Sequence, residues 1–187
     1  MPAIPRRERY GTLGGSALVL LFVFLYVGFW LIWDGHASGE EEVRPGTTIA
    51  VSDDVSYVPA DGWSLERSAI TPGRQSTVAS GPSAFSVAVS TWMGSPDEQI
   101  AREKKLLEAG SKAHLYGNDQ TFHTAHGLTG VKFSYFAPKA EGILWIAYDS
   151  KTKTVVTLNG QSAPGTLPAA ADRFQEMVDS VRTGAGA

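Results

Sequence analysis

The hydrophobic positions of this chain form one unbroken run near the N-terminus, followed by short segments in which apolar and polar residues alternate. Residues 17–33 contain no charged side chain, and with the weakly polar residues 13–16 the run is 21 residues long. A helix rising about 1.5 Å per residue would cover about 30 Å over this length, which is the thickness of a bilayer's hydrocarbon core. The run is apolar on every side, which disfavours a helix packed in a soluble core. The pattern predicts a transmembrane helix over residues 13–33.

A cleaved signal peptide is the alternative for this segment. Signal peptides have a shorter apolar region followed by a small-x-small cleavage site, and residues 35–37 (GHA) fit such a site. However, the run is too long for a signal peptide, and Tyr26, Trp30 and Trp33 occupy its outer half. Amphipathic aromatic rings favour the headgroup level of a bilayer. We therefore favour a permanent single-pass anchor with these three residues at the membrane interface.

The charges on either side of the run predict its orientation. The positive charges precede it: Arg6, Arg7 and Arg9. Acidic residues follow it, at Asp34 and at 40–42. Because positively charged flanks stay cytoplasmic, we expect residues 1–12 to lie in the cytoplasm and the residues from about 34 onward to lie outside the cell membrane. The chain has no cysteine, which excludes disulfides and a lipid-carrying cysteine.

The remainder of the chain has the composition of a tether and one domain. Residues 34–46 are small, polar and acidic, and we expect them to form an acidic tether. Residues 47–183 carry the patterned segments and are expected to form one extracytoplasmic domain. A domain of this size can bury roughly two-thirds of its unfolded surface, so it can be stable without disulfides. Residues 184–187 are predicted to be a flexible tail.

Alternation with a period of two predicts most of the strands. Between Ala84 and Trp92, larger residues such as Phe85 and Val87 fall on one face and small residues on the other. Comparable segments predict strands at 47–51, 55–58, 63–67, 76–80, 131–136, 142–148 and 154–158. The strand at 142–148 is apolar on both faces, which is typical of a strand inside a sheet that is covered on both sides. We expect Trp63 and Trp145 to lie in the core.

Two helices are predicted, one of them with a strong start signal. Residues 95–98 (SPDE) form a capping box with proline at the first helical position, and this helix is expected to run to about Ala109 and end at Gly110. The second spans Leu167–Arg182, with apolar residues at helical spacing. Because the connections between the later strands are short, those strands should be antiparallel. The predicted fold is α+β: a transmembrane helix, then a mostly antiparallel sheet flanked by two helices, an α/β/α sandwich.

The sequence contains no strong catalytic or metal-binding motif. There is no phosphate-binding loop, dinucleotide fingerprint or nucleophile elbow. His114, His123 and His126 lie within 13 residues beside Asp119. In a strand, His123 and His126 would point to opposite faces, whereas in a loop they could converge on a metal. We expect surface histidines, no metal, no cofactor and no enzymatic activity. The net charge of −3 without a basic block argues against nucleic acid as a partner.

The aromatic residues outside the expected core are the main candidates for binding. Trp and Tyr combine a large apolar area with a hydrogen-bonding tip, which suits a partner or ligand surface. The possible contact residues are Tyr116, Trp92, Tyr135, His123 and His126. Tyr116 is the strongest of these, because it lies in a segment, 115–120, that is predicted to be a loop.

Several segments of the chain resemble a known family. Residues 57–63 (YVPADGW) resemble the opening of PsbP-like domains, a group that includes PsbP, DcrB, LpqN and LpqT. Residues 155–164 (VVTLNGQSAP) and 177–182 (MVDSVR) resemble the closing strand, proline-bearing loop and last helix of that family. The resemblance covers residues 47–183. It implies an α/β/α sandwich. This chain, as a membrane-anchored bacterial version, departs from the lipoprotein members of the family, because a transmembrane helix is predicted where they have a lipidated cysteine. It also implies a binding or assembly subunit.

These observations together favour a non-catalytic interaction module. We expect a membrane-anchored accessory subunit that contacts a membrane or envelope protein outside the cell membrane, with residues 13–33 in the lipid bilayer. The alternative is a carrier or sensor of a small ligand, a lipid or a glycan, that binds in a cleft beside the sheet.

Overall fold

The computed structural model describes residues 40–91, 94–149 and 153–184. Contacts within the chain divide it into residues 1–38 and 39–187, and the described residues lie in the second unit. The predicted transmembrane helix over 13–33 lies outside the described residues. So do its predicted interface residues and topology charges: Tyr26, Trp30, Trp33, Arg6, Arg7 and Arg9. Among the described helices, none has the length and hydropathy needed to cross a bilayer.

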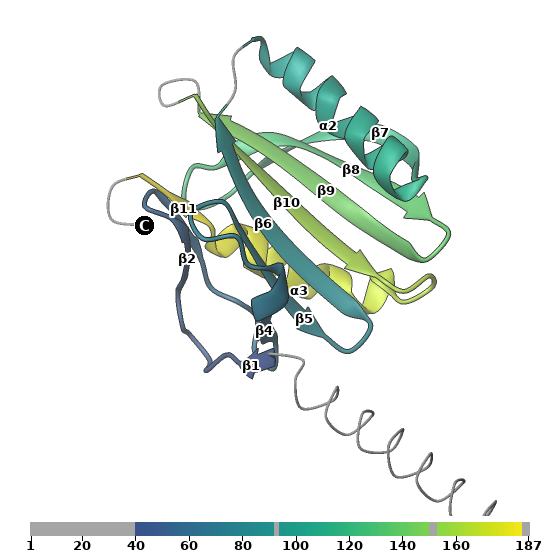
Figure 1. Cartoon of the computed structure of the whole chain (residues 1–187). Coiled ribbons are helices and arrows are strands. Elements are labelled where there is room, and N and C mark those ends of the chain that lie inside the picture. The colour runs from purple at the N-terminus through teal and green to yellow at the C-terminus, as the bar shows by residue number, and fades with distance from the viewer. Residues whose placement is uncertain (1–39, 92–93, 150–152, 185–187) are drawn as a thin grey trace, which may run out of the picture. The chain divides into compact units, whose positions relative to one another are not determined.

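The described residues form an α+β domain with a mostly antiparallel sheet and two helices, as predicted. The main sheet has the strand order β1-β4-β5-β6-β10-β9-β8-β7 (Figure 1). Its strands are β1 (Glu40–Glu42), β4 (Ser64–Glu66), β5 (Gln75–Ser80), β6 (Ser83–Thr91), β7 (His114–His123), β8 (Thr129–Ala137), β9 (Ala140–Asp149) and β10 (Thr154–Ser162). A smaller sheet has the order β11-β3-β2, from β2 (Ile49–Ser52), β3 (Val55–Tyr57) and β11 (Arg182–Thr183). The helices are α2 (Pro96–Ser111), α3 (Leu167–Ser180) and a short 3-10 turn, η1 (Arg67–Ala69).

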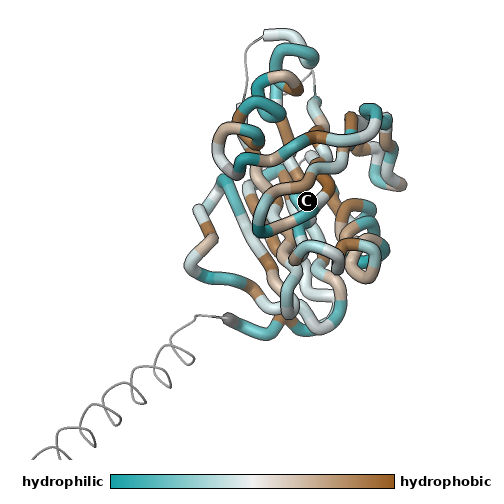
Figure 2. The backbone as a smooth tube through the Cα atoms, turned by 90° about the vertical axis from the view of Figure 1, so that its right-hand side faces the viewer, coloured by the Kyte–Doolittle hydropathy of each residue, from teal (hydrophilic) through white to brown (hydrophobic). Residues whose placement is uncertain are grey.

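One face of the main sheet, the α3 face, carries the larger hydrophobic core. Side chains from β6, α3 and the small sheet pack together there, and the rings of Phe85 and Phe174 are stacked with centroids 6.1 Å apart. Trp63 meets Phe174 edge-on at 5.8 Å. Trp63 and Trp145 are each 1% exposed, which confirms both as core residues. Hydrophobic positions lie along the strands in the middle of the domain, while the outer turns are largely hydrophilic (Figure 2).

The opposite face, the α2 face, carries a smaller cluster under α2. Ile100 and Leu107 of the helix pack against four buried side chains of the sheet: Phe133, Leu144, Ile146 and Val155. Trp145 and Ala147, which alternate with two of these residues along β9, belong instead to the core on the α3 face. The prediction that this strand is covered on both sides is therefore confirmed, because two separate helices cover the two faces.

Helix α2 begins as predicted but ends later. The Ser95 side chain accepts a hydrogen bond from the Glu98 N–H at 3.3 Å, and the Glu98 carboxylate accepts one from the Ser95 N–H at 2.8 Å. The predicted end at Gly110 is wrong by one residue, since the helix includes Ser111. The reason is that Lys112 adopts the left-handed conformation, with φ of 53°, that glycine was expected to supply.

The predicted acidic tether, 34–46, is in part a strand. Residues 34–39 lie outside the described residues, but Glu40–Glu42 forms β1 and pairs with β4 at the edge of the main sheet. An ion pair between Arg67 and Glu41, with N and O atoms 2.5 Å apart, joins the two segments. Because both side chains are more than half exposed, pairing with β4 rather than this ion pair is the main cause of the strand.

Candidate functional site

Strand β7 forms one edge of the main sheet and passes through the segment predicted to be a loop. The loop predicted at 115–120 is wrong, since β7 pairs with β8 on both sides of a bulge that lies between Tyr116 and Gln120. Gly117, in the bulge, has φ of +78°, which glycine adopts without strain. Asp119 accepts hydrogen bonds from the Lys104 ammonium of α2 on both carboxylate oxygens, each at 2.6 Å. The turn-forming residues thus occupy the bulge, and α2 holds it in place.

Two aromatic side chains are exposed side by side on β7 and β8. Tyr116 is 50% exposed and Phe136 is 45% exposed, two of the highest values among large hydrophobic residues in the described part of the chain. In the strand register, His114 faces Phe136 and Tyr116 faces Ser134. Tyr116 and Phe136 are therefore diagonal neighbours on one face, within reach of one another's rings. We call these four residues the aromatic surface.

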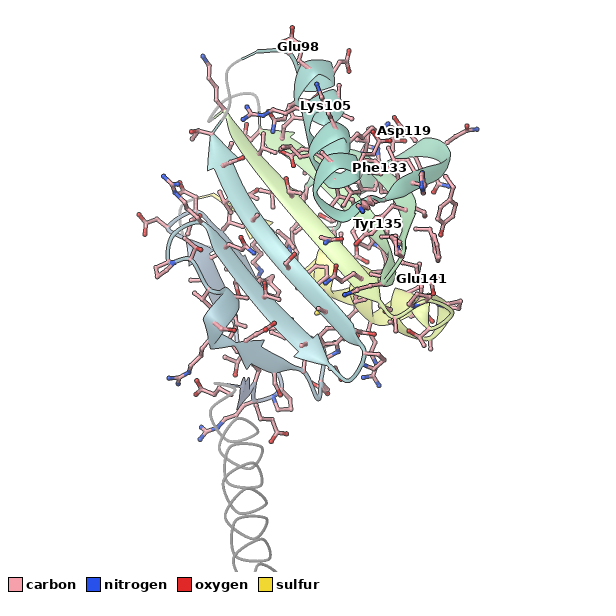
Figure 3. All side chains as sticks on the ribbon, turned by 45° about the vertical axis from the view of Figure 1, so that its right-hand side comes forward. Glu98, Lys105, Asp119, Phe133, Tyr135 and Glu141 are labelled. Atoms are coloured by element: carbon pink, nitrogen blue, oxygen red, sulfur yellow. The ribbon has the colours of Figure 1, made fainter. Side chains whose placement is uncertain are left out.

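The aromatic surface lies on the α3 face of the sheet. Leu115 and Tyr135, which alternate with its members, pack together with Leu107 of α2 on the opposite side. Figure 3 shows Phe133 and Tyr135 on the side of β8 that faces α2. Phe136 must therefore point away from α2.

A hollow of about 260 Å³ adjoins the aromatic surface. Tyr116 lines it together with Gln120, the half-buried Lys132 and Ile143. Because Lys132 contributes a positive charge and Ile143 an apolar wall, the hollow suits one partner side chain placed beside a carboxylate. The surface and the hollow together make a continuous exposed site at one edge of the sheet.

The structure places the predicted contact residues in different environments. Tyr116 is exposed, as expected of a contact residue, whereas Tyr135 is 2% exposed and cannot present its ring to a partner. The Tyr135 hydroxyl donates to the Asn159 side chain at 2.9 Å, and burial raises the pKa of Tyr135 above its ordinary value of 10.0. Trp92 lies outside the described residues.

His114, His123 and His126 are exposed but are not gathered into a site. His114 and His123 begin and end β7, and His126 lies in the turn that follows. Within the described ranges, no group of three His, Cys, Asp or Glu side chains could hold a metal ion.

Phe136 is the site residue that sequence reasoning missed. The signal was present in β8, because the residues on one of its faces include Phe133 and Tyr135, while the other face carries Lys132 and Ser134. The polar face of such a strand is the one expected to meet water. Phe136 falls on that polar face, so the alternation marks it as the exposed aromatic residue and Tyr135 as the buried one.

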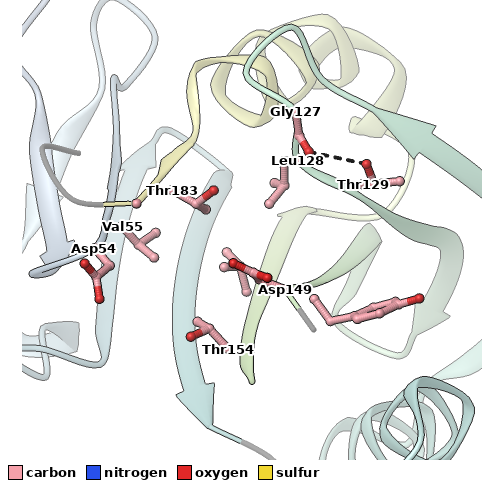
Figure 4. A pocket seen from close by; sticks show the side chains of 11 residues that line it. Asp54, Val55, Gly127, Leu128, Thr129, Asp149, Thr154 and Thr183 are labelled. Atoms are coloured by element: carbon pink, nitrogen blue, oxygen red, sulfur yellow. Dashed lines mark hydrogen bonds between the residues drawn. The ribbon is translucent and has the colours of Figure 1, made fainter. Parts of the chain in front are cut away.

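A second candidate site is a pocket of about 480 Å³ where the strands of both sheets end, which we call the end pocket (Figure 4). Its aliphatic side chains are Val55, Leu128 and Val156, each at most 6% exposed, and the aromatic side chain of Tyr148, which is 39% exposed, also lines it. Its polar side chains are Asp54, Asp149, Thr129, Thr154 and Thr183. No Lys, Arg or His side chain is among the described residues that line it.

Comparison with known proteins gives the fold. No protein-family model matches the sequence, and no curated protein sequence is significantly similar to it. Among solved structures, the cyanobacterial PsbP protein CyanoP of Synechocystis sp. PCC 6803 is similar, with a TM-score of 0.53 and 14% identity. The alignment covers 71% of this chain and 88% of CyanoP. The domain has a PsbP-like fold.

Two solved structures of Mog1 are also similar to the domain. The Ran-binding protein Mog1p of Saccharomyces cerevisiae has a TM-score of 0.50 at 11% identity, over 70% of this chain and 90% of Mog1p. A variant of Mog1 gives 0.52 at 10% identity, over 75% of this chain and 96% of that protein. At such identities the likeness concerns the PsbP-like fold and not the site residues.

Proposed function

We propose that this chain is a membrane-anchored, non-catalytic accessory subunit whose extracytoplasmic domain docks a membrane or envelope protein on the aromatic surface. The exposed pair of Tyr116 and Phe136 supports this most directly. Aromatic residues dominate the binding energy of protein interfaces when a partner desolvates them. The anchor in this proposal is the apolar run over 13–33.

The chemistry around the pair favours a protein partner. The adjoining hollow has room for a side chain, and Lys132 stands at its wall. A partner that inserts an apolar residue and places a carboxylate beside Lys132 would satisfy both features. An exposed histidine, His114, completes a polar rim, the arrangement that surrounds the apolar centre of many interfaces.

The position of the aromatic surface in the sheet also supports the proposal. The chain enters the domain through β1, at one edge of the sheet, and β7 is the opposite edge, seven strands away. At 4.7–4.9 Å between neighbouring strands, the two edges are about 33 Å apart along the sheet. A tether attached at β1 would leave the aromatic surface accessible to a neighbouring protein, while confinement to the membrane would raise its local concentration near membrane partners.

The structural neighbours add an argument by analogy. Mog1p is described as Ran-binding, so the PsbP-like fold serves protein recognition in at least one case. Function inferred from a shared fold is weaker than function inferred from a site, and the proposal therefore rests on Tyr116 and Phe136.

The test is site-specific photocrosslinking of the full-length protein in its membrane. A photoreactive amino acid at position 136 should give one defined adduct, identified by mass spectrometry, whereas the same group at position 106, an exposed leucine on α2, should not. The Tyr116→Ala/Phe136→Ala double variant should lose co-purification of that protein in mild detergent, and Leu106→Ala should keep it.

A chimeric protein separates the role of the domain from that of its anchor. If residues 1–38 are replaced by an unrelated membrane anchor, the proposal predicts that the same partner is retained. Loss of the partner on this exchange, with retention in the double variant, would place the interface in the N-terminal segment and overturn the proposal. Equal adducts from positions 136 and 106 would also contradict it.

A further inference from the structure

We infer that the partner docked on the aromatic surface adds an extended segment to the outer edge of β7, and that this segment brings a carboxylate to Lys132. The inference rests on the proposed docking function and specifies how the partner is held. β7 is the last strand of the main sheet, so one side of its backbone has no neighbouring strand among the described residues. An exposed strand edge is a template on which an extended segment of another chain can form strand hydrogen bonds.

The open part of this edge is residues 120–123, which we call the free edge. In the bulge that precedes it, the pairing with β8 is interrupted, and Asp119 is bonded to Lys104 of α2. A bulge and a charged side chain are two of the devices that protect an exposed edge from pairing. The free edge has neither, because its register with β8 is regular and it contains no Lys, Arg, Asp or Glu.

The backbone of the free edge points outward at two residues. The Thr124 N–H, directly after β7, donates to the Leu128 carbonyl at 2.9 Å, so it points toward the strand that pairs with β7. Along an antiparallel pair, residues alternate between backbone groups that face the partner strand and backbone groups that face away. The N–H and C=O groups of Thr121 and His123 therefore face away from β8. Both residues are exposed, so an added strand can reach these groups.

The hollow beside the free edge indicates one side chain of the added segment. Gln120 lines this hollow together with Lys132, which lies directly opposite it on β8. A side chain opposite Gln120 on an added strand would lie on the same face, two strands from Lys132, or about 9–10 Å. A lysine and a glutamate side chain together span this distance.

The charge of the hollow favours an acidic side chain at that position. Lys132 is half-buried, and among the described residues no carboxylate forms an ion pair with it. A partner carboxylate would complement this partly desolvated ammonium group. A second copy of this chain is a poorer occupant, because its own free edge offers no carboxylate to Lys132.

The free edge is continuous with the aromatic surface. Tyr116 belongs to that surface and also lines the hollow, which Gln120 of the free edge lines as well. A segment paired with the free edge therefore passes beside the hollow and leads to the exposed rings of Tyr116 and Phe136. Backbone hydrogen bonds would supply affinity, and the hollow would select the side chain.

Photocrosslinking of the full-length protein in its membrane tests the added strand. A photoreactive amino acid at position 121 should give an adduct with the same protein as position 136, whereas position 106 on α2 should not. The adducts from positions 121 and 123 should map to one segment of the partner, about two residues apart, because alternate residues of paired strands share a face. That segment should contain Asp or Glu.

Proline variants test the outward backbone groups. Thr121→Pro removes an N–H that faces away from β8, which a strand edge tolerates. The unfolding midpoint should change little, while the adduct yield from position 136 should fall at least fivefold. Ala125→Pro is the matched control, because it lies in the turn closed by the Gly127 N–H and the Thr124 carbonyl, 3.0 Å apart, and proline suits such turns. It should leave the yield unchanged.

A lysine variant tests the carboxylate. Lys132→Met keeps most of the side-chain length without the charge, and it should lower the adduct yield from position 136 several-fold. Lys105→Met removes a charge on the exposed side of α2 and should leave that yield unchanged. Thermal unfolding of every variant checks that the domain is intact.

The outcomes separate this inference from the docking proposal. An adduct from position 136 without one from position 121 would overturn the added strand and leave docking intact. So would a full yield from position 136 in a folded Thr121→Pro variant, or an adduct from position 121 with a second copy of this chain. If Thr121→Pro fails to fold, the adducts from positions 121 and 123 decide. An unchanged yield in Lys132→Met would overturn the carboxylate, and no adduct from position 136 or 121 would overturn both proposals.

Discussion

Tyr135 on β8 reaches across β9 and donates its hydroxyl hydrogen to the side-chain oxygen of Asn159 on β10, at 2.9 Å. The register places Gly142 opposite Tyr135 and next to β10, directly under this bridge. A Cβ atom at Gly142 would lie 2.6 Å from the Tyr135 hydroxyl oxygen and 2.5 Å from the Gly160 carbonyl oxygen. The absence of a side chain at Gly142 therefore allows three neighbouring strands to be joined by one tyrosine.

The first prediction is that Gly142→Ala destabilises the domain. The added methyl group must displace both the tyrosine ring and a backbone oxygen, and overpacking of this kind costs about 1–3 kcal/mol. Thermal unfolding should show a clearly lower midpoint. Gly110→Ala is the matched control, because a Cβ there meets nothing within 4 Å and the position is helical. That variant should be stabilised by about 0.5–1 kcal/mol. Equal midpoints for the two variants would contradict the close approach at Gly142.

The second prediction concerns alkaline pH and Tyr57. Its hydroxyl is within 3.1 Å of the Ser76 hydroxyl, and burial raises the pKa of Tyr57 from 10.0 to about 12. Because the folded state holds this proton more tightly than the unfolded state, its contribution to stability is complete below about pH 10 and is lost as the pH rises through about 12. The loss should be on the order of 2–3 kcal/mol.

Denaturant unfolding at about pH 8 and about pH 11 measures about half of this loss, because pH 11 lies midway between the two pKa values. Tyr57→Phe should be less stable than the wild type at neutral pH, by about 1 kcal/mol for the lost hydrogen bond. It should also lose less stability than the wild type as the pH rises. Tyr135, whose pKa is raised by burial as well, leaves some pH dependence in this variant. If the wild type and Tyr57→Phe lost the same amount of stability as the pH rises, Tyr57 would not be the cause of the alkaline destabilisation.

The third prediction is that Lys104 contributes through two contacts. Its ammonium group bonds both oxygens of Asp119 and lies 4.9 Å from the centre of the Phe133 ring. An exposed ion pair contributes up to about 1 kcal/mol, and a cation over an aromatic ring adds about 0.5–1 kcal/mol. Lys104→Met should therefore cost more than Asp119→Asn. The matched control is Lys105→Met, on the exposed side of α2, which should leave the free energy of unfolding nearly unchanged.

A double-variant cycle separates the two contributions of Lys104. The coupling between Lys104→Met and Asp119→Asn should shrink as salt is added, since ions screen a pair at the surface. The remaining cost of Lys104→Met reflects packing over Phe133 and should depend little on salt. Coupling that does not respond to salt would mean that the pair is not electrostatic.

Features of the fold that depend on neighbouring residues were predictable from the sequence. The Ser95 and Glu98 capping box acts within one turn, and its two hydrogen bonds are present. The doubly apolar strand at 142–148 required two covering helices, and both exist. Such signals are local or follow from burial, so they can be recognised in a single sequence.

Features that depend on distant partners were not predictable in the same way. Glu40–Glu42 has poor strand-forming residues and is a strand because β4 lies beside it. Gly117 and Asp119 are typical of turns, and their place in a bulge of β7 depends on β8 and on Lys104 of α2. The choice between Tyr135 and Phe136 as the exposed residue depended on which face α2 covers. The sequence therefore did not predict that Tyr116 lies in a strand, nor that Phe136 and not Tyr135 is the exposed residue of β8.

The last prediction contrasts a buried and an exposed aromatic residue. Trp63 is 1% exposed and meets Phe174, so Trp63→Ala should cost about 3–5 kcal/mol, while Tyr116→Ala should stay within about 0.5 kcal/mol of the wild type. The Trp63 indole N–H is buried without a hydrogen-bond partner among the described residues. Trp63→Phe removes that unpaired donor while keeping an aromatic ring, so it should cost much less than Trp63→Ala. Thermal unfolding should therefore respond to Trp63→Ala, and partner capture should respond to Tyr116→Ala. If Trp63→Ala left the unfolding midpoint unchanged but abolished partner capture, Trp63 would belong to the interface and not to the core.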